Sequence, residues 1–303
     1  MKRVLTAVVL IPLVLLLVFK ADPAFLSLAL GGVSYFCVRE FVEIAKGHGL
    51  RPLKRLLFGF VLFPYLVPAF ISFAFQFQPV PASSLFLLLL VCAPFAFLIP
   101  AVLRTNLNEA LPDAAVSLFG FLYIGIGLFS ILCLSSLVDY ARLLVFCLLA
   151  IVWSGDVSAY YVGTYRGQRK LAPRISPNKT WEGAIASFAV ATVVGSAILL
   201  NIQPIYDWLL THRLIPPSEG PFTGWGAHLP VFPVWFALSA SATINVAAQL
   251  GDLIESAMKR GARLKDSGAI LPGHGGMLDR VDALLFAAPV AMLLFAATLM
   301  GSP

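Results

Sequence analysis

Long apolar runs alternate with short polar stretches along almost the whole chain. A helix that crosses a bilayer needs about 20 mainly apolar residues. Nine runs approach that length, and they cover approximately residues 4–19, 24–45, 56–75, 83–103, 115–137, 142–162, 183–202, 231–257 and 281–300. We therefore predict an all-α fold, a polytopic integral membrane helix bundle with about nine transmembrane helices. The first run is expected to be an uncleaved helix rather than a signal peptide, because more spans follow it.

Composition supports lipid as the solvent for most of this chain. Hydrophobic residues make up 59% of the sequence, charged residues only 12%, and the mean hydropathy is +0.90. A soluble domain carries about 25% charged residues, so this chain has too few for a water-exposed surface. The net charge of +6 does not indicate a nucleic-acid partner, because the basic residues flank apolar runs and do not alternate with aromatic ones.

Basic residues fall mostly on one side of the predicted bundle. With nine spans, the N-terminus and every second loop share a side, and that side holds 17 of the 21 basic residues. The opposite side holds Lys20, Arg142 and Arg213. Cytoplasmic loops of membrane proteins carry the excess of Lys and Arg. We therefore expect a cytoplasmic N-terminus and a C-terminus outside.

Two cytoplasmic segments, 153–182 and 249–282, hold most of the residues that could carry polar chemistry. Two predicted spans separate them, so both reach the same face of the membrane and can converge there. The long loop 203–230 on the other face is rich in Pro and Gly. We expect it to be a surface connector without chemistry.

The second polar segment combines acids, bases and a glycine-rich turn. On a helix, Asp252, Glu255, Ser256 and Lys259 share one face. Ionisable residues within a span usually face a protein interior or a water-filled cavity. Carboxylates at two helix ends suit Mg²⁺, basic side chains suit phosphates, and glycines let backbone N–H groups approach an anion. The pattern predicts a site for a phosphorylated ligand and a divalent cation.

The first polar segment offers a second anion site. Ser176-Pro177 is expected to form a turn. Lys179 and Thr180 would then present an ammonium and a hydroxyl at a helix N-terminus, where anions commonly bind. The alternative is that Thr180 and Glu182 only cap the helix that follows.

Both segments resemble the signatures of the phosphatidate cytidylyltransferase family. In residues 256–282, SAMKRGARLKDSGAILPGHGGMLDRVD, the family pattern falls on Ser256, Lys259, Arg260, Lys265, Asp266, His274, Gly275, Gly276, Asp279, Arg280 and Asp282. In residues 153–183, WSGDVSAYYVGTYRGQRKLAPRISPNKTWEG, it falls on Asp156, Ala159, Tyr160, Ser176, Pro177, Lys179, Thr180, Glu182 and Gly183. Asn178 stands where many members have Lys. The resemblance covers roughly residues 100–300, and it is specific only over 153–183 and 251–282.

The resemblance implies a reaction in phospholipid biosynthesis, in which CTP and phosphatidate give CDP-diacylglycerol and pyrophosphate. It places the metal-binding acids at Asp252 and Asp279, with Mg²⁺ as the cofactor and room for a second, monovalent cation. The implied catalytic residues are Asp252, Lys259, Arg260, Lys265, Asp266, His274, Asp279 and Asp282. The implied substrate-binding residues are Asp156, Tyr160, Ser176, Lys179, Thr180, Glu182, Ser256, Gly275, Gly276 and Arg280.

The same resemblance implies a location and an assembly. The expected protein is a multi-pass homodimer of the cell (inner) membrane, with its active site on the cytoplasmic face. We divide the chain into N-terminal transmembrane helices at 1–110 and a catalytic transmembrane region at 111–303.

Two other functions stay open at this point. One is a cytidylyltransferase that acts on another lipid phosphate, such as an archaeol-type or polyprenyl acceptor. The other is an ion-coupled transporter, in which acids such as Asp156 and Asp252 would form an ion path. Transporters often contain repeated halves, and no internal repeat is visible in this sequence.

Overall fold

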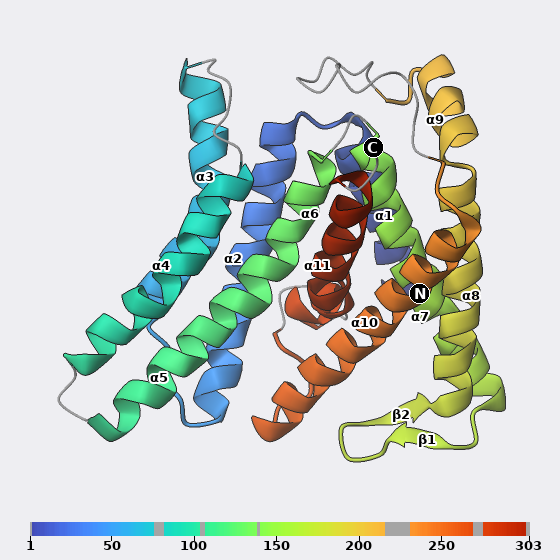
Figure 1. The fold of residues 1–303 in the computed structure, drawn as a ribbon. Coiled ribbons are helices and arrows are strands. Elements are labelled where there is room, and N and C mark those ends of the chain that lie inside the picture. The colour runs from blue at the N-terminus through green and yellow to red at the C-terminus, as the bar shows by residue number, and fades with distance from the viewer. Residues whose placement is uncertain are drawn as a thin grey trace.

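The computed structural model describes residues 2–75, 82–103, 107–137, 140–215, 231–268 and 275–300. The helices in chain order are α1 (Lys2–Lys20), α2 (Pro23–Gly47), α3 (Lys54–Phe75), α4 (Ala82–Val102), α5 (Leu107–Gly120), the π-helix η1 (Phe121–Ile126), α6 (Gly127–Ser135), α7 (Ala141–Arg166), α8 (Trp181–Leu200), α9 (Ile202–Thr211), α10 (Val234–Gly261) and α11 (Leu278–Met300). Figure 1 shows these helices packed side by side as one bundle. The predicted helix bundle is confirmed.

Membrane-spanning capacity is clear for six helical stretches among the described residues, judged by length and hydropathy. They are Pro23–Gly47, Asn108–Ser135, Ala141–Arg166, Trp181–Leu200, Val234–Gly261 and Leu278–Thr298. Leu10–Lys20 and Leu87–Pro100 are shorter apolar helices. The bundle is therefore that of a multi-pass membrane protein, whereas the count of nine spans and the orientation stay predictions.

Two elements differ from the expectation of helices joined by simple loops. Strands β1 (Lys170–Ala172) and β2 (Ser176–Thr180) form an antiparallel hairpin. The prediction of a turn at Ser176-Pro177 is wrong, because these residues begin β2. The turn comes just before these residues, at 172–175, where Ile175 N–H donates to Ala172 O at 3.1 Å. Pro173 supplies the fixed φ that suits the second position of such a turn.

The second difference is α9, which occupies the start of the loop expected at 203–230. The centroid of the Trp208 ring lies 4.5 Å from that of the His212 ring, one turn later. Residues 216–230 of that loop lie outside the described residues. The expected connector therefore begins as a helix rather than as an irregular loop.

Small residues allow close packing between the helices that carry the polar segments. A side chain on Gly155 of α7 would collide with Ser187 of α8 and with Asn245 of α10. Asn245 Nδ2 donates to Ser187 Oγ at 3.1 Å across the same contact. Close approach through small residues and interhelical hydrogen bonds is the usual way in which membrane helices associate. This packing fixes α7, α8 and α10 relative to one another.

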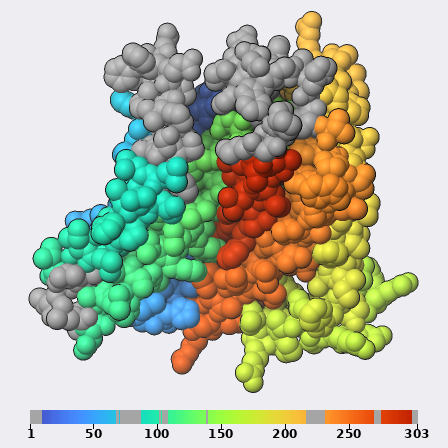
Figure 2. Space-filling model, viewed as in Figure 1, coloured from blue at the N-terminus to red at the C-terminus, as the bar shows by residue number. Residues whose placement is uncertain are grey.

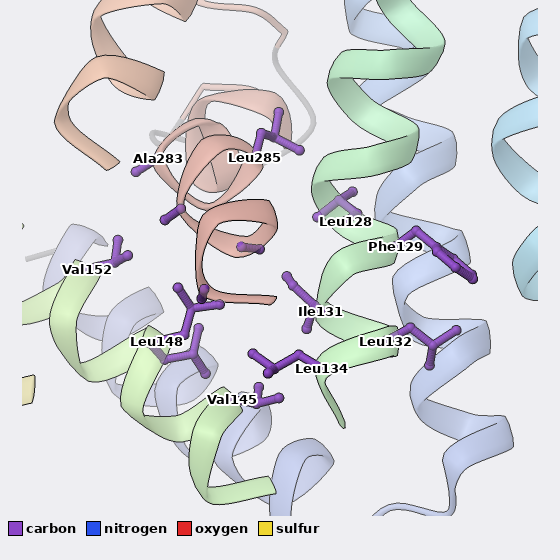
Figure 3. Close-up of a cluster of buried hydrophobic side chains, with 14 of the residues drawn as sticks. Leu128, Phe129, Ile131, Leu132, Leu134, Val145, Leu148, Val152, Ala283 and Leu285 are labelled. Atoms are coloured by element: carbon purple, nitrogen blue, oxygen red, sulfur yellow. The ribbon is translucent and has the colours of Figure 1, made fainter. Parts of the chain in front are cut away.

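A second contact seats α11 against α10 and α6. A Cβ on Gly251 of α10 would lie 2.6 Å from the backbone oxygen of Asp282 on α11. On its other side, α11 packs against α6 and α7 through Leu285, Leu128 and Leu148, which belong to one buried apolar cluster (Figure 3). The acids of α10 and α11 are therefore held on closely packed helices.

Candidate active site

The two polar segments meet at one end of the bundle. The hairpin, the C-terminal end of α10 and the N-terminal end of α11 lie near one another (Figure 1), and Figure 2 shows the hairpin and α10 at the same end of the surface. Lys179 Nζ of β2 lies 2.6 Å from Asp252 Oδ2 of α10. Arg260 Nε of α10 donates to Ile175 O of the hairpin turn at 3.2 Å. The convergence expected from the sequence is present.

Four acids form what we call the helix-side cluster: Asp156 of α7, Asp252 and Glu255 of α10, and Asp282 of α11. Asp282 interacts electrostatically with the other three, and Asp156 also interacts with Asp252. Lys179 pairs with Asp252. Asp282 accepts a hydrogen bond from the Ala283 N–H at 2.8 Å. Among the described residues, neither Asp156 nor Asp282 forms an ion pair.

The spacing of acids along α10 has the consequence expected from a helix. Ser256 Oγ donates to Asp252 Oδ1 at 3.4 Å, one turn away. Glu255 is fully buried and its carboxylate lies 2.5 Å from Lys259 Nζ, also one turn away. Lys259 therefore serves as the counter-ion of a buried acid, which would be costly to leave unpaired.

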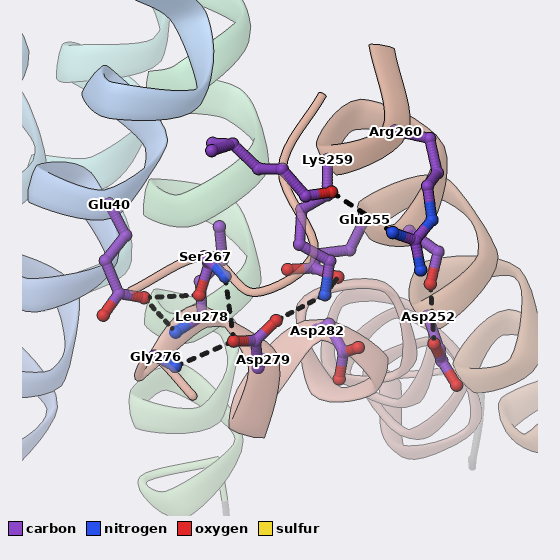
Figure 4. Close-up of polar contacts among 12 residues, drawn as sticks. Glu40, Asp252, Glu255, Lys259, Arg260, Ser267, Gly276, Leu278, Asp279 and Asp282 are labelled. Atoms are coloured by element: carbon purple, nitrogen blue, oxygen red, sulfur yellow. Dashed lines mark hydrogen bonds and ion pairs between the residues drawn. The ribbon is translucent and has the colours of Figure 1, made fainter. Parts of the chain in front are cut away.

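A second group surrounds the start of α11, and we call it the loop-side cluster: Glu40 of α2, Ser267, Gly276, Leu278 and Asp279 (Figure 4). Asp279 Oδ2 accepts from Gly276 N at 2.8 Å and from Ser267 N at 3.0 Å, and Asp279 Oδ1 pairs with Lys259. Glu40 accepts from Ser267 Oγ at 2.8 Å and from Leu278 N at 2.7 Å. Lys259 thus joins this cluster to Glu255 of the helix-side cluster.

Two glycines of the turn before α11 are required by these carboxylates. Gly275 has φ +77°, a conformation that side chains rarely adopt, and a Cβ there would lie 2.5 Å from Asp279 Oδ2. A Cβ on Gly276 would overlap Ser267 Oγ and Glu40 Oε2. The sequence indicated these glycines as contacts for a ligand anion, but the Gly276 amide is directed to the protein's own Asp279.

The hairpin residues are split between two roles. Thr180 caps α8 by accepting from Gly183 N at 3.2 Å, and Glu182 accepts from the N–H groups of Gln168 and Arg169 at 3.1 and 3.2 Å. The capping role weighed as an alternative is thus present at Thr180, and Glu182 fastens the chain before β1. Lys179 alone among the three reaches the acids.

Several other expected residues do not join the clusters. The side chain of Tyr160 is 67% exposed and lies edge-on to Tyr161, with ring centroids 5.5 Å apart. Lys265, Asp266 and Arg280 are exposed beside the turn, and Ser176 is half-buried in the hairpin. His274 lies outside the described residues.

Comparison with known proteins identifies the family. The chain matches the profile of the cytidylyltransferase family over residues 1–298. It belongs to this family. It is similar to the phosphatidate cytidylyltransferase of Bacillus subtilis (strain 168), with 32% identity over 297 residues, or 97% of both chains. It is also similar to the proteins of that name from Pseudomonas aeruginosa PAO1, 32% identical over 310 residues (100% and 99%), and Haemophilus influenzae Rd, 30% identical over 327 residues (95% and 96%).

The family match also covers the N-terminal helices. In that region the sequence showed hydrophobic character but no motif. That region holds a site residue that the motifs did not reveal. Glu40 was visible as an acid near the end of a predicted span, where ionisable residues are often functional. No pattern in the sequence linked it to residues 267–278, since only tertiary packing brings them together.

The acids of both clusters fit a divalent cation by their chemistry. Carboxylates are the hard oxygen ligands that Mg²⁺ prefers. Within the part of the chain that the structure describes, three of five acids, namely of Asp279 and the four of the helix-side cluster, pair with two lysines, Lys179 and Lys259. Among the described residues, no three acids, histidines or cysteines are already arranged around a common metal position. Asp252 and Asp279 instead each form an ion pair with a lysine.

Proposed function

We propose that this chain transfers the cytidylyl group of CTP to phosphatidate, giving CDP-diacylglycerol and pyrophosphate. The supporting observation is the family match over residues 1–298, together with full-length relatives that are named phosphatidate cytidylyltransferase. The convergence of two basic and acidic segments at one end of an apolar bundle agrees with it. A lipid substrate stays in the bilayer while CTP arrives from water, so the end of a membrane bundle can receive both.

The reaction depends more on neutralising the charges of the two phosphate substrates than on a strong general base. A phosphate oxygen of phosphatidate attacks the α-phosphorus of CTP, a new P–O bond forms, and the bond to the β-phosphate breaks as pyrophosphate leaves. A phosphomonoester has a second pKa of about 6, so the nucleophile is already ionised at neutral pH. The enzyme must therefore hold two anions in line, which basic residues do.

The exposed bases around the turn are suited to the phosphates. We assign Arg260, Lys265 and Arg280 to phosphate binding, because they are exposed at the end of α10 and the start of α11. Lys179 and Lys259 each occupy the position of a counter-ion on an acid. Both ammonium groups can instead hold a phosphate when a metal neutralises those acids.

We place Mg²⁺ at Asp252 and Asp279, where it would neutralise the phosphate charge of CTP. Asp282 has remaining acceptor capacity beside Asp252, and Ser256 adds a hydroxyl oxygen one turn away. Lys179 and Lys259 offset the negative charges of Asp252 and Asp279, so these acids can lie near one another without the metal ion. A second, monovalent cation at the same site stays part of the proposal.

The proposal includes a topology. Nine spans, a cytoplasmic N-terminus and a cytoplasmic active site in the inner membrane follow from the distribution of basic residues. Labelling of single-cysteine variants from outside sealed cells tests this. Positions 170 and 263 should stay unlabelled. Strong labelling at either position would contradict the proposed orientation. Cross-linking of the purified protein in lipid tests the proposed homodimer.

The decisive experiment is incorporation of labelled CTP into lipid by the purified protein. Product should require phosphatidate, and replacement by a polyprenyl phosphate should abolish it. Labelled lipid formed with the polyprenyl acceptor but not with phosphatidate would reassign the acceptor. The family match decides against an ion-coupled transporter, and the absence of any labelled lipid would decide against the transferase.

A further inference from the structure

Glu40 of α2 is a buried acid outside both sequence motifs. Its side chain is 3% exposed. Oε1 accepts from Met277 N at 2.9 Å, and Oε2 accepts from Leu278 N at 2.7 Å and from Ser267 Oγ at 2.8 Å. A carboxylate only accepts hydrogen bonds, and all three partners are donors. Glu40 therefore joins Ser267 to the backbone at the start of α11.

Glu40 and Asp279 hold the same short pieces of chain from opposite sides. Ser267 gives its hydroxyl to Glu40 and its backbone N–H to Asp279. Gly276 N donates to Asp279, while the next two amides donate to Glu40. Figure 4 shows the two carboxylates facing each other across these donors. The position of Asp279 thus depends on a chain path that Glu40 fixes.

Close packing leaves this arrangement little freedom. A Cβ on Gly268 would lie 2.5 Å from Glu40 Oε1, and one on Gly276 would overlap Glu40 Oε2. The carboxylate is therefore enclosed by backbone on both sides. Asp279 pairs in turn with Lys259, which is only 11% exposed and also holds Glu255. A shift of the turn would displace an acid and a lysine of the site together.

We propose that Glu40 is a positioning residue of the transferase, which holds the turn before α11 so that Asp279 and Lys259 keep their places at the reacting phosphates. It does not contact substrate itself, since its oxygens are occupied by donors of the chain. This inference rests on the proposed function for its kinetic part. Its structural part, control of the turn by α2, is measurable without activity.

The test variant is Glu40→Gln, which keeps the shape of the side chain but replaces one acceptor oxygen by a donor NH₂. In either orientation of the amide that donor faces a backbone N–H, of Met277 or of Leu278, so at least one hydrogen bond is lost. The matched control is Glu43→Gln, on the same helix, where the acid is 56% exposed and pairs only with Lys46 among the contacts described. A graded variant is Ser267→Ala, which removes one donor to Glu40 and keeps the backbone bond to Asp279.

Two measurements are made on each purified variant. Amide hydrogen exchange should show faster exchange in peptides that cover 275–282 for Glu40→Gln, with α7 and α8 unchanged, because local opening is separate from global unfolding. The kcat should fall at least tenfold, with KM for CTP changed less than about threefold. Ser267→Ala should give a smaller effect of the same kind, and Glu43→Gln should match the wild type in both measurements.

Three results would overturn the inference. They are an unchanged kcat in Glu40→Gln, a reduced kcat with unchanged exchange at 275–282, and a general loss of protection in all helices, which would make Glu40 a stability residue only. Failure of the proposed function is recognised separately, because the wild type would then make no labelled lipid while the exchange experiment still reports on the turn.

Discussion

The loop-side and helix-side clusters use the same residue type in different ways. In the loop-side cluster, Glu40 accepts from three donors of the chain and Asp279 from two amides and a lysine. In the helix-side cluster, Asp282 accepts one backbone N–H, and the interactions of Asp156 with other described residues are electrostatic, with Asp252 and Lys179. Glu40, whose oxygens accept only from the chain, shapes the backbone, whereas Asp282 and Asp156 have spare acceptor capacity for a ligand. Asp279 combines both roles, because Oδ2 accepts from the backbone while Oδ1 pairs with a lysine that a metal ion could replace.

Asp252→Asn tests the helix-side cluster and should have the largest effect. The amide removes a negative charge that a metal requires, so kcat/KM should fall at least about a hundredfold, or about 2.7 kcal/mol in transition-state free energy. Asp207→Asn, at an exposed acid of α9, is the control and should leave kcat/KM unchanged. A folded Asp252→Asn protein with wild-type magnesium dependence would assign Asp252 to the Lys179 ion pair alone.

Gly276→Ala tests how tightly the loop-side cluster is packed. The new methyl group would overlap Ser267 Oγ and Glu40 Oε2, so the free energy of unfolding should fall by about 1–3 kcal/mol. Gly32→Ala in α2 is the matched control, because a Cβ there meets nothing within 4 Å. Its unfolding free energy, measured by denaturant titration in mixed micelles, should be equal or higher. Equal destabilisation by both variants would contradict a packed cluster.

Asp113→Asn extends the comparison to an engaged acid that belongs to neither cluster. Asp113 of α5 is 2% exposed and its Oδ1 accepts from Arg51 N at 2.7 Å, before the start of α3. Loss of that acceptor should lower the free energy of unfolding by about 1 kcal/mol. The kcat/KM of the folded protein should stay within about twofold. A larger kinetic effect would mean that engaged acids outside the two clusters also act on catalysis.

Lys265→Ala should have a small effect that is confined to the reaction, because Lys265 is exposed. Removal of one phosphate contact should lower kcat/KM for CTP at least about threefold, with little change in stability. Steady-state kinetics with varied CTP measure it. A value within about twofold of the wild type, roughly 0.4 kcal/mol, would exclude a phosphate-binding role.

Hydrophobic runs were enough to predict the helices, because a lipid-facing helix needs an apolar run of fixed length. The positions of the two polar segments were enough to predict that they could converge, and Lys179 and Asp252 do meet. The hairpin was missed because Ser176-Pro177 is also a common turn pair. The role of Glu40 could not be predicted, because its partners lie more than 220 residues away in the sequence.

That separation has a consequence for the biogenesis of the protein. Glu40 and its donor Met277 are 237 residues apart, and a ribosome adds about 5–20 residues per second, so roughly 10 to 50 seconds pass between their synthesis. During this interval the carboxylate of Glu40 lacks these partners. The α11 helix therefore has two roles: it packs against α10 and α6, and its first backbone N–H donates to a carboxylate that was made near the beginning. A chain that stops before residue 267 contains none of the three donors to Glu40.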